Sequence, residues 1–161
     1  MVEMQQHDCT EQDVHALSYT LSEADRNELI AVGVLAPNEV ALECLRRCAM
    51  NSEKTYAIRL RGATLAIGGY TVSGNCWFLS SKHLSKISKE ERSHFRAQLM
   101  ENLLNTLKLF PVLCNMAWAK NTQHLRLIES CGGRIGTSGY APSGEEFVYF
   151  EFRREDYPQL N

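Results

Sequence analysis

The N-terminal residues lack the features of a secretory signal peptide, because Met1–Thr10 contains neither a basic start nor an apolar run. Long apolar runs are also missing. The uncharged stretch Gly62–Ser81 extends for 20 residues but contains four glycines, together with serines, threonines and an asparagine. This composition predicts strands and turns rather than a membrane span. We therefore expect a soluble protein of the cytoplasm that has no membrane partner.

Internal repeats, linkers and low-complexity tracts are absent as well. With 161 residues, the chain is long enough to bury a core and short for two domains. We expect a single domain over residues 1–161, with a mostly helical, acidic part at 1–53 and a sheet core at 54–152. The 44% of hydrophobic and 22% of charged residues are ordinary for a globular protein.

The six cysteines form neither a disulfide framework nor a complete metal-binding pattern. They are scattered, several of them within apolar segments, as reduced core cysteines are. Cys44 and Cys48 are four residues apart, a spacing that puts two thiols on one helix face and could supply half of a zinc site. No second Cys or His pair with ligand spacing lies near them in the sequence. We expect six free thiols and no metal.

Opposite charges dominate the two parts of the chain. Residues 1–53 contain ten acidic and three basic side chains, which gives −7, and residues 54–161 contain nine acidic and 14 basic, which gives +5, for a total of −2. The two parts could dock on each other, or the acidic part could face a basic partner. A solvated acidic face on helical segments explains the same pattern, and we favour that interpretation.

Capping signals predict helices in the first third of the chain. Thr10 and Ser22 are N-cap residues, each followed three residues later by an aspartate. Gly33 is a stop signal for the second helix, and Pro37 marks the place where a third helix could begin.

A meander of three antiparallel strands follows, at Thr55–Leu60, Ala63–Val72 and Cys76–Leu79. Gly68 and Gly69 interrupt the second strand, which indicates a bulge or a close approach of another backbone. The sheet core therefore begins near residue 54.

The last meander strand opens a βαβ unit. Ser88 starts a helix with a capping box, Pro111 ends it, and the apolar stretch Val112–Ala119 predicts a strand covered on both faces. The remaining elements are a short helix and a closing hairpin, at 122–131, 134–137 and 146–152. The fold class is α/β (α+β), with a mixed sheet.

This order of elements resembles the GNAT acyltransferase superfamily, in which a splayed pair of parallel strands opens a cleft for acyl-CoA. Four segments within residues 65–133, LAIGG, CWFLSS, HFRAQLME and WAKNTQHLRLIESCGG, also look like the internal virion protein A family of short-tailed lytic phages, itself GNAT-like. The most specific piece is W-x-x-N-T-x-H-x-R-x-[IL], from Trp118 to Ile128. The likeness covers roughly residues 55–152 and implies a GNAT-like fold in a phage protein.

The chain departs from the GNAT pattern at two positions that carry the chemistry of those enzymes. They hold the CoA pyrophosphate on backbone N–H groups of a glycine-containing turn at the start of the long helix. The corresponding stretch here, Ser81–Ser88, has no glycine, and Leu84 and Ile87 would crowd a phosphate. Many members also have a tyrosine seven residues after the asparagine that starts the short helix, and this tyrosine protonates the leaving thiolate. Ile128 stands there and cannot donate a proton.

The residual candidates for the cleft are Asn121, His124 and Lys82, and we expect no catalytic residue. Asn121 is also explained as the residue that caps the short helix, which we favour, and His124 as one that hydrogen-bonds a loop carbonyl. Lys82 belongs to a lysine-rich stretch with few aromatics and two offsetting acids, which is typical of a solvated loop rather than a nucleic-acid site. The chain has no Walker A loop, no G-x-S-x-G and no H-E-x-x-H.

Trp118 ends the predicted buried strand, just before the chain turns over the sheet edge. A tryptophan at such a place is more often a core residue than a platform for a ligand. We therefore expect Trp118 to matter more for stability than Trp77, which lies in the short strand of the meander.

Three functions fit these observations. The first is a phage protein with a degenerate, non-catalytic GNAT fold, a pseudo-enzyme that acts in virion morphogenesis through protein contacts and uses no cofactor. The second is an acyl-CoA-dependent N-acetyltransferase with a divergent cofactor site, which would use acetyl-CoA. The third is an inhibitor that binds a host factor during infection. The missing glycines and Ile128 favour the first and the third over the enzyme. We expect protein partners, from the virion or the host, no nucleic acid, and a location in the host cytoplasm or the virion.

Overall fold

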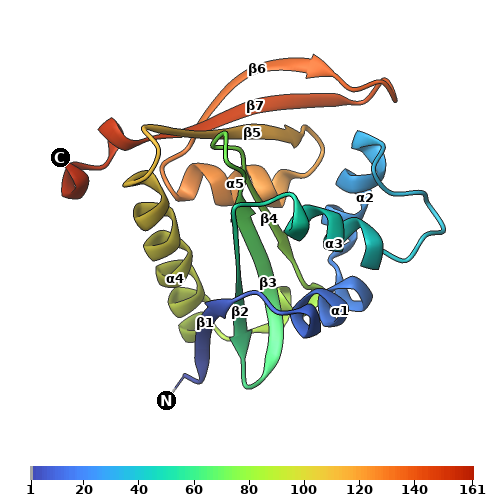
Figure 1. Ribbon diagram of the computed structural model, residues 1–161, viewed down its shortest axis with the longest axis horizontal. Helices are drawn as coiled ribbons and strands as arrows, with labels where there is room; N and C mark the ends of the chain where they lie inside the picture. The colour runs from blue at the N-terminus through green and yellow to red at the C-terminus, as the bar shows by residue number, and fades with distance from the viewer. Residues whose placement is uncertain (1) are drawn as a thin grey trace.

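A computed structural model describes residues 2–161, which form two antiparallel sheets with helices packed around them (Figure 1). The first sheet has the strand order β1-β2-β3-β4 and the second has the order β5-β7-β6. The strands are β1 Met4–Asp8, β2 Lys54–Leu60, β3 Ala63–Tyr70, β4 Cys76–Ser80, β5 Val112–Trp118, β6 Arg134–Tyr140 and β7 Glu146–Arg153. The helices are α1 Glu11–Thr20, α2 Glu23–Val32, α3 Leu42–Met50, α4 Lys89–Leu107 and α5 Thr122–Ser130, with short 3₁₀ helices at η1 Lys82–Lys86, η2 Arg154–Asp156 and η3 Pro158–Leu160.

Helices cover both faces of the first sheet. On one face Leu17 of α1 and Leu45 of α3 pack with Ile67 of β3. On the other face Phe95 of α4 packs with Ile58 of β2, and Figure 1 shows α4 on the opposite side of this sheet from α1 and α3. Because β3 is the covered middle of the sheet, it is buried almost throughout, which explains why this segment carries no charge.

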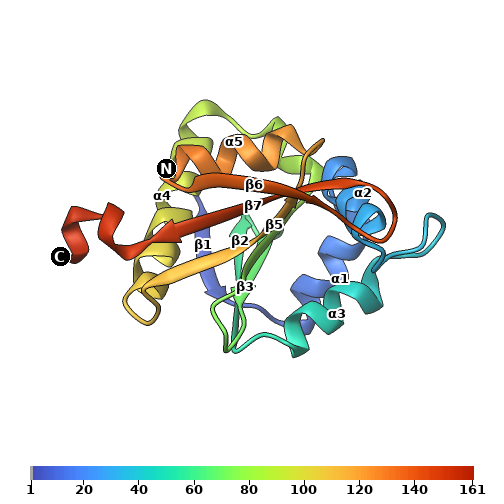
Figure 2. The same ribbon diagram turned by 90° about the horizontal axis from the view of Figure 1, so that it is seen from above.

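The second sheet lies across one end of the first and closes the core from that side (Figures 1 and 2). Its inner face contributes Leu113, Phe150 and Phe152, which pack with Leu107 of α4 and Ile128 of α5. The two sheets therefore share the long helix, and the expected α+β architecture with an antiparallel meander and a C-terminal hairpin is confirmed. The mixed sheet that the sequence predicts is divided into two antiparallel sheets, because within residues 2–161 β4 and β5 join only through one parallel bridge, between Asn75 and Cys114.

The local signals in the sequence set the ends of the helices. Thr10 and Ser22 cap α1 and α2 through their hydroxyl groups, and Ser88 forms a reciprocal capping box at the start of α4. Gly33 adopts the left-handed conformation, with φ of +89°, and ends α2. Asn121 caps α5 with its side chain. These five positions are as predicted.

The N-terminal part differs from the prediction in two ways. Residues 4–8 form β1, which pairs antiparallel with β2 from Met4 opposite Leu60 to Asp8 opposite Tyr56. The third helix begins at Leu42 rather than near Pro37, because the loop before it is fixed by Arg26, whose guanidinium donates to the carbonyl of Pro37 at 2.8 Å and to that of Glu39 at 2.7 Å.

Gly69 lies at a close approach between two strands. A Cβ atom at this position would lie 2.4 Å from the carbonyl oxygen of Lys54 in β2. The paired glycines thus mark a close backbone approach, which is one of the two alternatives that the sequence left open. The other alternative was a bulge at these glycines, but the irregularity in the β2–β3 pairing falls between Ile58 and Arg59. Within residues 2–161, no helix is both long and apolar enough to cross a membrane.

Candidate functional site

β4 and β5 are the pair that corresponds to the splayed strands of a GNAT cleft. They meet at their beginnings, where Asn75 and Cys114 form a parallel bridge and the side-chain amide of Asn115 donates to the carbonyl of Cys76 at 2.8 Å. Beyond that point each strand pairs within its own sheet. The gap between their far ends is therefore the place where the family's acyl-CoA cleft would open.

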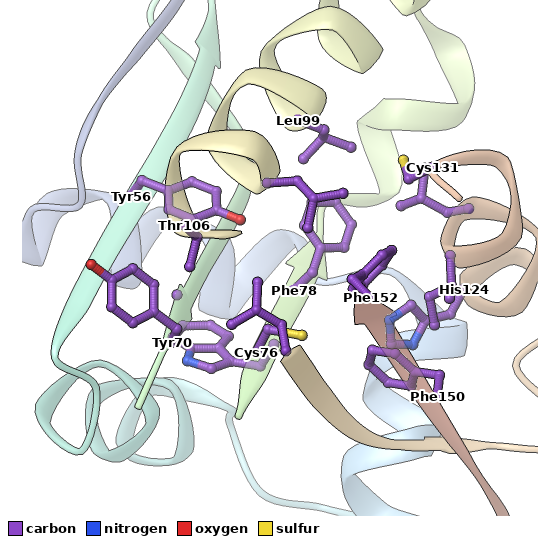
Figure 3. A pocket seen from close by; sticks show the side chains of 16 residues that line it. Tyr56, Tyr70, Cys76, Phe78, Leu99, Thr106, His124, Cys131, Phe150 and Phe152 are labelled. Atoms are coloured by element: carbon purple, nitrogen blue, oxygen red, sulfur yellow. The ribbon is translucent and has the colours of Figure 1, made fainter. Parts of the chain in front are cut away.

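Apolar side chains fill the space behind this gap. A cavity of about 90 Å³ remains among them, and Figure 3 shows the rings of Phe78, Phe150 and Phe152 converging there from β4 and β7. Ile128, at the position of the family's tyrosine, lines the same cavity and is buried. Small-molecule sites usually have about 300–1,000 Å³, so this cavity by itself would not hold an acyl-pantetheine arm. A larger hollow of about 430 Å³, lined by Asp25, Ser80 and His124, opens beside it between β4, α4 and α5.

Helix α2 closes the far end of the gap with two carboxylates. Asp25 accepts hydrogen bonds from the backbone N–H of Ser80, at the end of β4, at 2.8 Å and from its hydroxyl at 2.9 Å. Glu28 accepts from the backbone N–H of Trp118, at the end of β5, at 2.9 Å. One helix thus satisfies a backbone donor on each of the two separating strands, and Figure 1 shows α2 beside the end of β5.

Asn121 joins the two carboxylates from the other side. Its side chain is buried, with 1% exposed, and its amide nitrogen donates to Asp25 at 3.0 Å and to Glu28 at 3.3 Å. Its amide oxygen accepts from the backbone N–H of His124 at 3.3 Å and so caps α5. The residue that starts the short helix therefore also fastens α2 to it.

His124 completes the cluster. Its Nδ1 lies 3.4 Å from a carboxylate oxygen of Glu28, and its ring meets that of Phe150 edge to face. Burial favours the neutral imidazole, but the hydrogen bond to Glu28 and the charges of Glu28 and Asp25 outweigh it and raise the pKa of His124 above its ordinary value. The cluster of Asp25, Glu28, Asn121 and His124 thus favours a protonated histidine between acids.

The loop before α4 does not provide a phosphate cradle. Residues Lys82–Lys86 form the 3₁₀ helix η1, and the backbone N–H of Ser81 is already bonded to the carbonyl of Leu65 at 2.7 Å. At the start of α4, the hydroxyl of Ser88 accepts from the N–H of Glu91 at 3.1 Å. The residues that would hold the CoA pyrophosphate therefore do not fit that group, in agreement with the lack of glycine in this stretch.

Of the three candidates from the sequence, the structure brings Asn121 and His124 together and leaves Lys82 apart. Lys82 lines a separate surface hollow together with Trp118. The sequence analysis missed Asp25 and Glu28. In the sequence, Asp25 is recognisable only as an acid in the first turn of a helix. The three-residue spacing from Asp25 to Glu28 puts both acids on one helix face, and this spacing was the available signal that they act together.

Trp118 does not lie in the core, where the sequence analysis expected it, whereas its effect on stability stays a prediction. Within residues 2–161 it belongs to none of the three core clusters, and its side chain is half-buried. Trp77 is half-buried as well, but it packs against the core between the first sheet and α1–α3, and its indole N–H donates to the hydroxyl of Ser52 at 2.7 Å. The strand that Trp118 ends turns its inner face into the core with Leu113 and Ala117, which leaves Trp118 on the other face.

The cysteines are not members of the cluster of Asp25, Glu28, Asn121 and His124. Two of them, Cys76 and Cys131, line the small cavity of about 90 Å³. All six are free thiols. The neighbouring thiol of Cys48 lowers the pKa of Cys44 below its ordinary value. Within residues 2–161, no three metal-binding side chains come close enough to hold an ion.

Sequence comparison finds a phage family over the sheet core. The model of the family described as bacteriophage T7, probable scaffold protein Gp13, matches residues 54–138. The probable scaffold protein gp13 of Escherichia phage T7 is 30% identical over 82 residues, which are 51% of this chain and 59% of that protein. The match therefore spans less than two thirds of the relative, and α2 lies outside the range matched by the family.

Solved structures with a similar fold include acetyltransferases. A GNAT-family acetyltransferase from Bacillus anthracis has a TM-score of 0.67 at 14% identity, with 96% of this chain and 99% of that chain covered. An N-acetyltransferase from Staphylococcus aureus Mu50 has a TM-score of 0.65 at 14% identity, with 93% and 98% covered. At such low identity the likeness shows the fold alone, and that fold is GNAT.

Proposed function

The chain belongs to the family of the bacteriophage T7 probable scaffold protein Gp13, and on that premise we propose that it acts in virion morphogenesis as a non-catalytic GNAT-fold protein. Its work would be done through contacts with other proteins of the assembling particle, in the infected host cell. An assignment to the internal virion protein A family, whose members lie near the internal core of the particle, is the finer form of the same proposal. The resemblance of the four segments within residues 65–133 supports it.

The observation that carries the non-catalytic part is the position of α2. The backbone N–H groups of Ser80 and Trp118, on the two strands that would flank an acyl-CoA, already bond to Asp25 and Glu28. A ligand entering here would have to displace two charge-assisted hydrogen bonds, each worth about 1.5–3 kcal/mol, and leave two carboxylates without donors. These bonds support the proposal that the fold is kept without its acyl-CoA site.

Titration calorimetry with acetyl-CoA tests this part of the proposal. We expect no heat of binding at about 100 µM ligand, since functional sites usually saturate near physiological concentrations. One of the structurally similar GNAT enzymes serves as the positive control. A micromolar isotherm with this protein would show that the cleft opens, and the proposal of a pseudo-enzyme would be rejected.

Deletion of the gene from the phage that encodes it tests the role in assembly. We expect particles with altered internal structure in electron micrographs and a loss of infectivity, both restored by the gene supplied in trans. Particles of normal structure and normal infectivity would contradict a role in morphogenesis.

One observation favours the alternative of an acetyltransferase. His124 and Glu28 form a histidine–carboxylate pair next to the cleft, and a histidine held protonated in this way can serve as a general acid that gives a proton to the leaving thiolate. Transfer of acetyl groups from acetyl-CoA to polyamine or peptide amines, lost in a His124→Gln variant, would support this alternative.

A further inference from the structure

A basic hollow lies beside the closed cleft. It has a volume of about 950 Å³ and is bounded by α2, by η1, by the first turn of α4 and by the residues that lead into α5. Four exposed cationic side chains from three segments line it, namely Lys82, Arg92, Lys120 and Arg126. Trp118 forms an apolar part of the wall.

These cations are largely free of internal partners. Within residues 2–161, Lys82, Arg92 and Arg126 make no salt bridge. Lys120 pairs with Glu145 at 3.8 Å and lies over the ring of Trp118, 6.0 Å from its centroid, with 70% of the lysine side chain exposed. An ion pair so exposed contributes little. Glu23 is the one carboxylate among the lining residues. Uncompensated positive charge is therefore concentrated here in a chain whose net charge is −2.

An adjoining hollow extends the same charge along α4. It is lined by Lys89, Arg92 and Arg96. Arg92 borders both hollows, so the cations form one continuous band from η1 across the start of α4 towards α5. Asp25, which borders the second hollow, has its carboxylate bonded to Ser80 and Asn121, so it does not neutralise the band by a direct ion pair.

We propose that this hollow binds a short acidic segment of a partner protein. The inference rests on the proposed function, because it assigns the protein contact to a particular surface. Arginine guanidinium groups bind carboxylates in a bidentate manner, and Arg and Trp are the residue types that contribute most to protein interfaces. Arg92, Arg126 and Trp118 bring both types to one concave wall.

The surroundings favour a short peptide over a nucleic acid. The N-terminal part of the chain, with a net charge of −7, borders the hollow through α2 and Glu23. An extended polyanion would run on towards these acids, whereas a short acidic segment needs only the cations of the hollow. Trp118 is the single aromatic residue among the lining residues, and binding to single-stranded nucleic acid usually uses several such rings.

The experiment measures fluorescence anisotropy of a labelled twelve-residue peptide with six glutamates, against the same peptide with glutamines in their place. We expect binding of the glutamate peptide only, weakened by added salt. The double variant Arg92→Glu/Arg126→Glu should bind at least tenfold more weakly. The control variant Lys54→Glu/Lys108→Glu makes the same change of net charge at two exposed lysines that do not line the hollow and should bind like the parent.

Four results would overturn the inference. Equal weakening in both double variants would reduce the effect to net charge. Tighter binding of a twelve-residue oligo-dT than of the peptide would assign the hollow to nucleic acid, and displacement of the peptide by about 100 µM coenzyme A would assign it to a small ligand. Sedimentation that shows self-association lost in the hollow variant would make a second copy the occupant, which also contradicts a separate partner.

Failure of this inference and failure of the proposed function give different results. If the peptide does not bind while deletion of the gene still alters the particle, only the assignment of the surface is wrong. If the peptide binds as expected while the deletion phage is normal, the hollow is a real acidic-peptide site in a protein that has some other role.

Discussion

At the scale of single residues, the most completely bonded carboxylate is Asp13. It is fully buried and accepts from Arg59 and Thr64 at 2.7 Å, from the backbone and hydroxyl of Thr10 at 2.9 Å, and lies 3.0 Å from a ring nitrogen of His7. Burial opposes ionisation, but the hydrogen bonds, with that of Arg59 first, outweigh it and hold the pKa of Asp13 well below its ordinary range. Asp13 therefore fastens α1 to β1, β2 and β3.

Asp13→Asn should lower the free energy of unfolding at pH 7 by about 3–5 kcal/mol, because it breaks a buried ion pair. The folded-state pKa of Asp13 lies below the unfolded one. Its contribution is thus complete above about pH 4, the ordinary pKa of an aspartate, and is lost as the pH falls through the folded-state value. Denaturant melts from pH 7 to pH 2 should show a shallower acid-side loss in the variant than in the parent.

Glu11→Gln is the control for Asp13, since Glu11 is an exposed acid on the same helix, paired with Arg46 at 2.5 Å. We expect it to change stability by less than about 1 kcal/mol. An Asp13→Asn variant as stable as Glu11→Gln would mean that the buried pair contributes nothing.

We expect Trp77 to contribute more to the stability of the fold than Trp118, which is the opposite of the order that the sequence predicts. Trp77→Ala removes core contacts and a hydrogen bond and should cost about 3–5 kcal/mol. Trp118→Ala removes a half-buried side chain outside the core clusters and should cost about 1–2 kcal/mol. Thermal melts of both variants compare them directly, and a lower melting temperature for Trp118→Ala would restore the sequence-based expectation.

At the scale of elements, α2 holds the two sheets together at the point where β4 and β5 separate. Asp25→Ala should release the backbone N–H of Ser80, the hydroxyl of Ser80 and the amide of Asn121 from their acceptor. We expect a loss of about 2–4 kcal/mol and faster hydrogen exchange at Ser80 and across α2. Glu23→Ala, an exposed acid on the same helix, should leave both measurements unchanged. Unaltered exchange at Ser80 in Asp25→Ala would show that α2 docks without this carboxylate.

The pairing of β2 with β3 depends on the lack of a side chain at Gly69. Gly69→Ala places a Cβ against the carbonyl of Lys54, and the strands must move apart, at a cost of about 1–3 kcal/mol. Gly139→Ala is the matched control, because a Cβ there meets nothing within 4 Å. Chemical denaturation should separate the two variants, and equal stabilities would contradict the close approach.

At the scale of the whole molecule, the thiols report on the packing. Titration with a thiol reagent in denaturant, without reductant, should count six free thiols. In the folded protein at pH 8 fewer should react, because burial raises the pKa of Cys76 to about 12 and of Cys9 to about 11 and Cys44 is only 2% exposed. A count below six in denaturant would indicate disulfides and contradict the expectation of a reducing environment.

The sequence by itself determined the features that depend on neighbouring residues. The capping box of Ser88, the left-handed Gly33 and the cap at Asn121 are local hydrogen-bonding and steric requirements, and each fixes a helix end wherever that helix packs. The strands of the sheet core could likewise be predicted, because their apolar residues follow the spacing of a strand. The loss of glycine in Ser81–Ser88 and of the family's tyrosine at Ile128 could be read in the same way, since both are differences of residue type at one position.

Only the tertiary structure decided what occupies the cleft. Asp25 and Ser80 are 55 positions apart and Glu28 and Trp118 are 90 apart, so no local pattern shows that α2 bridges the ends of the two strands. The same holds for β1, which exists only because β2 offers its edge, and for the basic hollow, whose cations come from three separate segments. Contacts between distant segments depend on how every element packs, and that arrangement of the folded chain placed Trp118 at the rim of a hollow instead of in the core.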